Sequence, residues 1–325
     1  MVNIKDVAKH AGVSVATVSR LLNKKGYVSE AAKENIEAAI AALNYRPNQV
    51  ARSLSTKQTN LIGLIVPDIT NPFFPELARA VEDIALSYGY TIVLCNSDEN
   101  AEKEELYINM LTQKYVAGFI VTTNLLKAPH YEELSVPIVA LDRAINSMIP
   151  TVSTDNVEGA RIGTEYLLTC GAKNIVCMRG PVGLELADDR VKGFLKATSG
   201  KNVETHIVEC PFSFESSEKI AEKILIEFPE IDGIFASSDT SAIAALKVAQ
   251  SMGRNVPNDL QIVGFDGVQL GKMVSPGLTT VAQNIYKMGA SATRMLIKMI
   301  EDTSLQEKNV TVSAELIVRG TTRKD

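Results

Sequence analysis

The sequence predicts a small all-α helix-turn-helix head followed by an α/β body made of two parallel-sheet lobes. Three observations support this fold class: a helix-turn-helix pattern near the N-terminus, a later alternation of apolar and amphipathic stretches, and a length of 325 residues. Continuous Val/Ile/Leu runs between helical stretches indicate parallel strands that are covered on both faces. Because residues 61–325 are many for a single sheet, we expect two stacked lobes with a cleft between them.

Residues 4–23 have the residue types of a helix-turn-helix. Ala8 is small enough for two helices to approach closely, Gly12 can adopt the positive φ of a turn, and Ser14 can cap the second helix. Four apolar side chains supply the face that packs the two helices, namely Val7, Val13, Val18 and Leu21. The side chains able to face outward form a short surface suited to a DNA major groove, namely Val15, Ala16, Thr17, Ser19 and Arg20. An ordinary helical hairpin is the alternative.

A third helix is predicted over residues 29–43, where apolar residues recur at helical spacing behind a Ser29 cap, and Pro47 ends it. Residues 48–55 show one more short helical pattern, and residues 56–60 read as a linker. Eight residues are too few for a stable helix alone in water, because nucleation outweighs so few hydrogen bonds. We therefore expect this segment to fold only when something packs on it.

The body alternates predicted strands with predicted helices. Strands are expected at 61–66, 91–95, 118–122, 138–141, 174–178, 206–210, 233–236 and 261–264. Helices are expected at 75–87, 102–111, 159–169, 216–227 and 240–252. An apolar stretch over 285–300 is expected to cross between the lobes and to help pack the body. The expected domains are 1–47, 48–60 and 61–325, with lobe one at 61–157 and 285–318 and lobe two at 158–284 and 319–325.

Charge is divided unequally along the chain. The first sixty residues hold nine Lys or Arg and four Asp or Glu, whereas the remainder carries a net charge of −10. A basic head on an acidic body is expected when one end of a protein meets phosphate and the rest must stay in solution. No apolar run reaches the ~20 residues that cross a bilayer, and the N-terminus lacks the apolar core of a signal peptide. We therefore expect a cytoplasmic protein with no membrane partner.

The motifs give no support to an enzyme. Gly267 and Gly271 precede Lys272, but their spacing is not that of a phosphate loop, and no dinucleotide Gly fingerprint follows the first strand. His130 and His206 have no evident nucleophile or metal cluster, and the cysteines form no close pair with metal-ligand spacing. We therefore expect no catalytic residue, no cofactor and no metal site.

Polar and aromatic side chains gather where the predicted strands end, which is where parallel α/β sheets place ligand groups. The set comprises Asp68, Asn71, Phe73, Phe74, Asp142, Arg143, Asp239 and Asp266. Arg190 is expected to begin a helix of the second lobe. Together these groups suit a sugar, because charged groups bond paired hydroxyls and aromatic rings pack on C–H faces.

Simpler structural roles stay open for several of these residues. Asp239 at a strand end could be a helix cap. Phe73 and Phe74 could be core residues at the start of a helix. Asp142 and Arg143 could form a surface ion pair.

The motifs run in the order of a known family. The first helices, the Asn44-Tyr45-Arg46-Pro47-Asn48 exit and the Val50-Ala51-Arg52-Ser53-Leu54 segment resemble the LacI/GalR family of bacterial transcription repressors. The resemblance spans the body through Ile62-Gly63-Leu64-Ile65-Val66-Pro67-Asp68, Asn71-Pro72-Phe73-Phe74, Leu141-Asp142-Arg143, Ser238-Asp239 and Val263-Gly264-Phe265-Asp266. Within that family, the sequence is most similar to ribose-operon-type repressors.

This resemblance implies a periplasmic-binding-protein-like body and a set of DNA contacts on the second helix and on a hinge helix at 48–55. The implied DNA-binding residues are Ser14, Val15, Ala16, Thr17, Ser19, Arg20, Asn23, Asn48, Ala51 and Leu54. Arg20 would bond base edges, and the polar members would mostly position the helix on phosphate. Leu54 would enter the minor groove as a wedge and kink the duplex, although it could instead pack under the head.

The resemblance also implies the residues that hold a small-molecule effector. Family members that bind ribose use a constellation that maps onto Asn71, Phe73, Phe74, Asp142, Arg143, Arg190, Phe212, Asp239, Phe265, Asp266 and Gln283. Transport proteins of similar fold often carry Asn where Asp239 stands, and Phe214 could take the place of Phe212.

We therefore expect a homodimeric repressor of a sugar-utilisation operon that binds operator double-stranded DNA and is controlled by a small sugar, ribose or another pentose. Residues 96–98 and the helix at 75–85 also look similar to catabolite control proteins, which answer to a phosphorylated carrier protein. A phosphocarrier partner is thus the alternative. A purine-responsive repressor is a more distant one.

Overall fold

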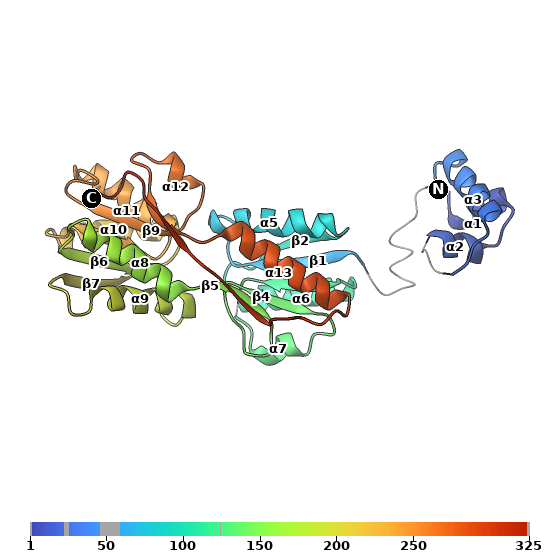
Figure 1. The fold of residues 1–325 in the computed structure, drawn as a ribbon, viewed down its shortest axis with the longest axis horizontal. Helices are drawn as coiled ribbons and strands as arrows, with labels where there is room; N and C mark the ends of the chain where they lie inside the picture. Colours follow the sequence, from blue (N-terminus) through green and yellow to red (C-terminus); the bar gives the residue numbers. More distant parts are fainter. Residues whose placement is uncertain (1, 23–25, 46–58, 124, 324–325) are drawn as a thin grey trace. The chain divides into compact units, whose positions relative to one another are not determined.

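The structure, a computed structural model, describes residues 2–22, 26–45, 59–123 and 125–323. It divides into two compact units, residues 1–59 and residues 60–325 (Figure 1). Each unit has its own hydrophobic core. The proposed hinge segment lies outside the described residues, and so do four of the expected DNA contacts, namely Asn23, Asn48, Ala51 and Leu54.

The first unit is the predicted head of three helices, namely α1 (Ile4–Ala11), α2 (Val15–Leu22) and α3 (Glu30–Ala42). The α1–α2 turn is made at Gly12, whose φ of 65° is a left-handed conformation that glycine adopts without strain. Val7, Val18 and Ile36 are fully buried and form the centre of the helical core. Ser29 caps α3 by accepting a hydrogen bond from the backbone N–H of Ala32, so the third helix starts where the sequence predicted.

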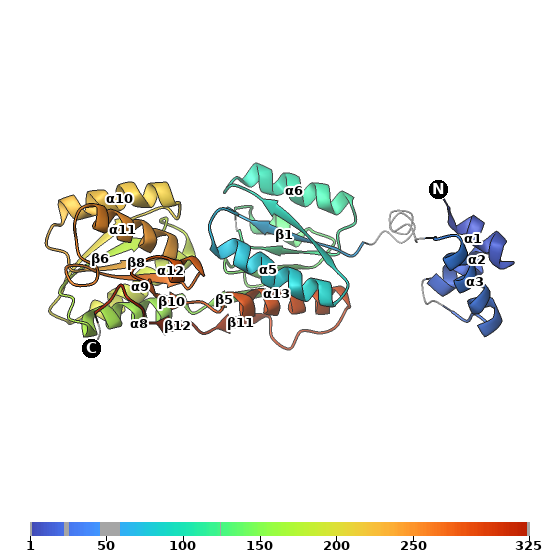
Figure 2. The ribbon, with the colours of Figure 1, turned by 90° about the horizontal axis from the view of Figure 1, so that it is seen from above.

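The first lobe of the body is a six-stranded parallel sheet with the strand order β11-β5-β4-β3-β1-β2. Its strands are β1 (Leu61–Val66), β2 (Thr91–Asn96), β3 (Gly118–Val121), β4 (Ile138–Leu141), β5 (Thr151–Thr154) and β11 (Asn309–Val312). Its helices are α5 (Phe73–Ser87), α6 (Ala101–Gln113), α7 (Ala128–Glu132) and α13 (Ile285–Ile300). Figure 2 shows α6 on one face of the sheet, with α5 and α13 on the other.

The second lobe is a second six-stranded sheet, with the order β12-β10-β9-β8-β6-β7, in which only β12 is antiparallel to its neighbour. Its strands are β6 (Asn174–Arg179), β7 (Glu204–Glu209), β8 (Gly233–Ala236), β9 (Gln261–Asp266), β10 (Thr279–Ala282) and β12 (Glu315–Ile317). Its helices are α8 (Asn156–Thr169), α9 (Glu185–Thr198), α10 (Phe214–Glu227), α11 (Asp239–Ser251) and α12 (Leu270–Met273).

The chain passes between the lobes three times, after β5, after β10 and after β11 (Figure 1). The third passage comes earlier than the sequence suggested. Residues 315–317, expected in lobe one, form β12 and pair with β10 of the second sheet. The predicted boundary at residue 318 therefore needs correction to the short connection between β11 and β12.

Helix α13 also differs from its prediction. It does not cross between the lobes but packs along α5 on the first sheet. The two helices approach closely at Gly289, where an added Cβ would lie 2.8 Å from the Cβ of Ala80. The apolar face of α13 contributes Ile285, Met288 and Leu296 to the core of lobe one. Among the described helices, none is long and apolar enough to span a membrane.

Candidate effector site and DNA-reading helix

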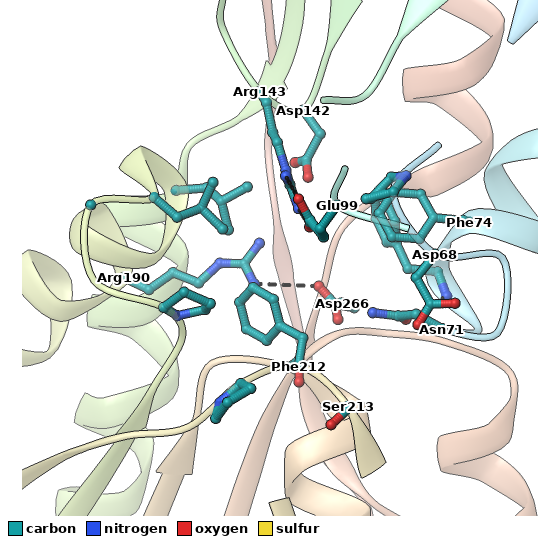
Figure 3. A pocket seen from close by; sticks show the side chains of 18 of the residues that line it. Asp68, Asn71, Phe74, Glu99, Asp142, Arg143, Arg190, Phe212, Ser213 and Asp266 are labelled. Carbon is teal, nitrogen blue, oxygen red and sulfur yellow. Dashed lines mark hydrogen bonds and ion pairs between the residues drawn. The ribbon is translucent and has the colours of Figure 1, made fainter. Parts of the chain in front are cut away.

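A cavity of about 550 Å³ lies between the two lobes, at the ends of strands from both sheets (Figure 3). Its volume is in the range of small-molecule sites in proteins. Eight of the expected effector residues line it, namely Asn71, Phe73, Phe74, Asp142, Arg143, Arg190, Phe212 and Asp266. The strand-end rule for parallel sheets therefore located the cavity correctly.

The loop after β1 supplies the first wall. Phe73 and Phe74 begin α5 with their rings edge to face and 5.2 Å apart, and they belong to the core of lobe one as well as to the cavity lining. Phe73 and Phe74 are therefore core residues and lining residues at the same time, so the two expected roles do not exclude each other. Asn71 accepts a hydrogen bond from the backbone N–H of Phe73 at 3.1 Å, and Asp68 accepts from the N–H and the hydroxyl of Thr70. These bonds fix the two polar side chains at the rim.

Asp142 and Arg143 follow β4 but do not pair with each other. Asp142 has a left-handed φ of 69°, and its buried Oδ1 has no hydrogen-bond partner among the described residues. Burial raises the pKa of Asp142, while the positive charges of Arg190 and Arg143 oppose that shift. Arg143 instead forms two parallel hydrogen bonds to Glu99, Nη1 to Oε2 at 3.1 Å and Nη2 to Oε1 at 2.8 Å. The expected alternative, a surface ion pair of the two neighbours, is therefore wrong.

The second lobe contributes a buried pair of opposite charge. Nη1 of Arg190 lies 3.5 Å from Oδ1 of Asp266, and both side chains are almost fully buried. Arg190 also donates from Nε to Asn156 at 2.8 Å and from Nη1 to the carbonyl of Ser237. It lies in the second turn of α9, so the expectation that it begins a helix was several residues off. Burial raises the pKa of Asp266 to about 7, against the opposing effects of Arg190 and of the hydrogen bond from Gln283.

Three expected effector residues lie behind the cavity and not in its lining. Phe265 is fully buried, and its ring centroid is 3.9 Å from the guanidinium carbon of Arg190. Gln283 is buried and donates from Nε2 to Oδ1 of Asp266 at 2.8 Å. Asp239 is fully buried as well. These positions correct the expectation of direct contact, because they support the lining side chains from behind.

Asp239 holds the loop that follows β9. Its Oδ2 accepts from the backbone N–H groups of Gly267 and Val268 at 2.8 and 2.9 Å, and its Oδ1 accepts from the hydroxyl of Thr280 at 2.6 Å. It is not the cap of α11 either, since Ser238 fills that role. Burial and the neighbouring charge of Asp266 raise the pKa of Asp239.

The structure distinguishes the two candidate phenylalanines after β7. Phe212 lines the cavity and lies against Gly180, where an added Cβ would come within 2.3 Å of the ring. Phe214 begins α10 and lies under Lys247, with Nζ 5.3 Å from the ring centroid.

Several lining residues were missed by the sequence analysis, among them Glu99, Leu125, Val182, Leu184, Leu186 and Ser213. Glu99 stands in the loop after β2, where no apolar or glycine pattern marks a ligand site. The segment 181–184 follows β6, so the strand-end rule could have found it.

In the head, α2 has the surface expected of a DNA-reading helix. Ser14 accepts a hydrogen bond from the backbone N–H of Thr17 at 3.1 Å and thereby caps the helix. Val15, Ala16 and Arg20 are exposed, whereas Thr17 and Ser19 are half-buried. Tyr27, after α2, is 87% exposed and was not singled out from the sequence.

A helix-turn-helix unit in one chain with a two-lobed, ligand-binding body defines the class of ligand-responsive DNA-binding regulators. Residues 3–48 match the family described as bacterial regulatory proteins, lacI family. Residues 164–322 match the periplasmic binding protein-like domain. With the full-length similarities that follow, these matches show that the chain belongs to the LacI family of bacterial transcription regulators.

Curated relatives align along the whole chain. The ribose operon repressor of Halalkalibacterium halodurans is 53% identical over 99% of this chain and 98% of its own length. That of Bacillus subtilis is 40% identical over the full length of both. Catabolite control protein A of Priestia megaterium is 37% identical over 99% of both chains.

Solved structures share the fold. A LacI-type regulator from Alkaliphilus metalliredigens, complexed with D-xylulofuranose, matches with a TM-score of 0.76 and 32% identity, over 82% of this chain and all of that one. The lac repressor dimer bound to its operator and the anti-inducer ONPF matches with a TM-score of 0.86 and 26% identity, over 98% of each chain.

Proposed function

We propose that this protein is a transcriptional repressor of a sugar-utilisation operon, controlled by a small sugar, ribose or another pentose, bound between the lobes of its body. The observation that carries the proposal is that Asp142 of the first lobe and the Arg190–Asp266 pair of the second lobe line the same cavity (Figure 3). Carboxylate oxygens accept hydrogen bonds and a guanidinium donates them, which matches the neighbouring hydroxyls of a sugar. The ribose operon repressors among the relatives support the same effector class.

Each wall of the cavity has a role in this proposal. Asp142 and Asp266 accept hydrogen bonds from neighbouring hydroxyls, and Arg190 donates to a hydroxyl or ring oxygen. Phe74 and Phe212 pack on the C–H faces of the sugar ring from opposite lobes. Because the two carboxylates come from different lobes, a sugar that bonds both favours one arrangement of the lobes over others.

On the DNA side, we propose that Val15, Ala16 and Arg20 read base edges in the major groove and that a homodimer presents two such helices to an operator. The lac repressor dimer on its operator supports this arrangement. Leu54, outside the described residues, is proposed as the minor-groove wedge. Such a protein acts in the cytoplasm and needs no catalytic group.

The sugar would act by changing how the two lobes lie against each other and thereby how the hinge segments meet DNA. Coupling between two sites in one protein is typically about 1–3 kcal/mol, which is ~5- to 150-fold in affinity. For a repressor of sugar utilisation, the expected sign is induction, so that sugar weakens operator binding.

Two titrations test the proposal. Calorimetry of the full chain against ribose, other pentoses, hexoses and purines identifies the effector, and fluorescence anisotropy with operator and random DNA measures specific binding with and without it. Arg20→Ala should weaken operator binding by roughly 10- to 100-fold with sugar binding unchanged. Absence of sequence-specific DNA binding at moderate salt, with every candidate effector tried, would contradict the proposal.

Response to a phosphorylated carrier protein is the second candidate, because catabolite control protein A is also a full-length relative. The residues that suggested it have partners within the lobe: Asn96 accepts from the backbone N–H of Ile69 at 2.7 Å, and Ser97 donates to the carbonyl of Val66 at 3.2 Å. A change in operator affinity with the carrier protein, and none with any sugar, would favour this candidate.

A further inference from the structure

The side chain of Glu99 extends into the cavity from the loop between β2 and α6, whose backbone conformation is uncommon. Asp98 and Glu99 have consecutive left-handed φ angles of 54° and 51°, a conformation that is uncommon for residues other than glycine. The loop is held in this shape from both sides. Asn96 and Lys103 contact the carboxylate of Asp98, and Asn100 caps α6 by accepting from the backbone N–H of Lys103 at 2.9 Å. These contacts hold the loop in the conformation from which the side chain of Glu99 extends toward Arg143.

The carboxylate of Glu99 occupies the binding face of Arg143. Both terminal nitrogens of the guanidinium bond both oxygens of Glu99, at 3.1 and 2.8 Å (Figure 3). The Arg143 side chain is 6% exposed, whereas that of Glu99 is 50% exposed and reaches into the cavity from its rim. Two parallel hydrogen bonds between a guanidinium and a carboxylate are among the strongest charge-assisted contacts in proteins.

An anionic ligand would need that same face. The fork of an arginine is the protein group best matched to a carboxylate or a phosphate. The second arginine of the cavity is also paired with a carboxylate, since Nη1 of Arg190 lies against Asp266, while Nε and Nη1 bond Asn156 and Ser237. The other ionisable groups in the lining are acidic, namely Asp68, Asp142 and Asp266. The lining thus holds more acidic than basic groups, and each arginine is already paired with a carboxylate.

We propose that Glu99 is a specificity-determining residue that restricts this cavity to uncharged sugars and excludes phosphate esters and sugar acids. The inference rests on the proposed function in one respect only, namely that the ligand of the cavity is a sugar. Glu99 acts by filling the fork of Arg143 and by repelling a second negative charge, so a neutral polyol enters while its anionic analogue would have to displace the carboxylate.

Calorimetry of the full chain against D-ribose, D-ribose 5-phosphate and D-ribonate tests the proposal. Glu99→Gln keeps the size of the side chain and removes its charge, so affinity for both anionic probes should rise by about tenfold or more. Glu99→Asp keeps the charge and should still reject them. Glu105→Gln, on the exposed face of α6, removes the same charge away from the cavity and should behave as the unaltered protein. Thermal unfolding of each variant checks that the body is intact.

The outcomes separate this inference from the proposed function. The inference fails if the unaltered protein binds D-ribose 5-phosphate as tightly as D-ribose. It also fails if Glu99→Gln and Glu105→Gln have the same affinity for the anionic probes, because Glu99 then does not determine whether the cavity accepts neutral or anionic ligands. If the unaltered protein binds no neutral sugar while Glu99→Gln gains affinity for the anionic probes, the proposed effector is wrong and the role of Glu99 stands.

Discussion

At the scale of single residues, the body keeps its most costly groups where the ligand is proposed to bind. Asp142 combines a left-handed backbone with a buried, unpartnered carboxylate oxygen. Asp266 has a φ of 118°, which few residues other than glycine adopt, and it is buried beside Arg190. Strained backbones and unsatisfied polar groups persist when function requires them, so these two aspartates are the first positions to test.

Replacing Asp142 with Asn should weaken sugar binding by roughly 10- to 100-fold, because a hydrogen bond to a charged acceptor is lost. Asn tolerates the left-handed backbone, so the fold is retained. The melting temperature should stay the same or rise, since a buried carboxylate without a donor is destabilising. Calorimetry and thermal unfolding measure the two effects, and an unchanged sugar affinity would remove Asp142 from the site.

The raised pKa of Asp266, about 7, makes stability depend on pH. In the unfolded chain, an aspartate loses its proton near pH ~4, so the folded state binds more protons between about pH 4 and pH 7. The stabilising contribution is complete below the unfolded pKa and is lost as pH rises through the folded one. The free energy of unfolding should therefore fall by up to roughly 4 kcal/mol over that window.

Asp266→Asn should flatten this profile. Urea unfolding at several pH values measures it, with the exposed Asp302→Asn as the control that leaves the slope in place. An Asp266→Asn profile as steep as that of the unaltered protein would show that another group titrates there. Asp239, whose pKa burial also raises, would be the next to change.

At the scale of elements, the segment after β9 links the cavity to the packing of the lobes. Asp266 is followed by Gly267 and Val268, whose backbone N–H groups bond Asp239. The side chain of Val268 packs into the hydrophobic cluster of the first lobe, and the N–H of Gln269 donates to Glu76 of α5 at 2.6 Å. A ligand that moves Asp266 therefore acts on an element that touches both lobes.

Asp239→Ala should destabilise the body by about 2–4 kcal/mol, because two buried backbone N–H groups and the hydroxyl of Thr280 lose their acceptor. Sugar affinity should fall as well, although Asp239 does not line the cavity. Thr280→Val removes only the hydrogen bond to Oδ1 of Asp239 and should lower the free energy of unfolding by a smaller amount. Denaturant unfolding of the two variants compares them, and equal stability of Asp239→Ala and the unaltered protein would show that the loop holds its shape without this anchor.

The composition of each strand explains whether the sequence could predict it. Buried strands such as β1, β4 and β8 are continuous apolar runs and were located at their observed bounds. β5 and β11 are short and rich in Thr and other polar residues, and they pair at one edge of the first sheet, so no apolar run marks them.

Site residues followed a similar rule. Side chains at or directly after the ends of β1, β4 and β9 were found, whereas those after β6 were missed. Glu99 was missed as well, because its position depends on two consecutive left-handed residues, which the sequence does not reveal. The position of Asp239 behind the lining could not be predicted either, since it depends on the path of the loop after β9.

At the scale of the whole molecule, the described chain forms two units with separate cores. The body begins at Asn60, whose side chain donates to the carbonyl of Gly89 and whose carbonyl accepts from the N–H of Thr91. Those bonds tie the first residue of the body to its own sheet. The division predicts that the body folds without the head.

A chain that starts at Asn60 should bind sugar within about twofold of the full chain and should not bind operator DNA, because the contacts in the cavity lie wholly within residues 60–325. Calorimetry and anisotropy on the truncated and full chains compare the two activities. A truncated body that unfolds or loses its sugar affinity would show that the head stabilises it.

Most of the cavity lining stands on loops and on the first turns of helices beyond the strand ends, whereas Asp266 is the last residue of β9 and belongs to the ladder of the second sheet. Ligand specificity and the sheets that support the site are thus encoded largely by different segments of the chain. A codon change from Glu to Gln alters one base, so a lineage could shift such a regulator toward a new class of nutrient in one step. Engineers of biosensors could take the same route, by randomising those loops while leaving the sheets alone.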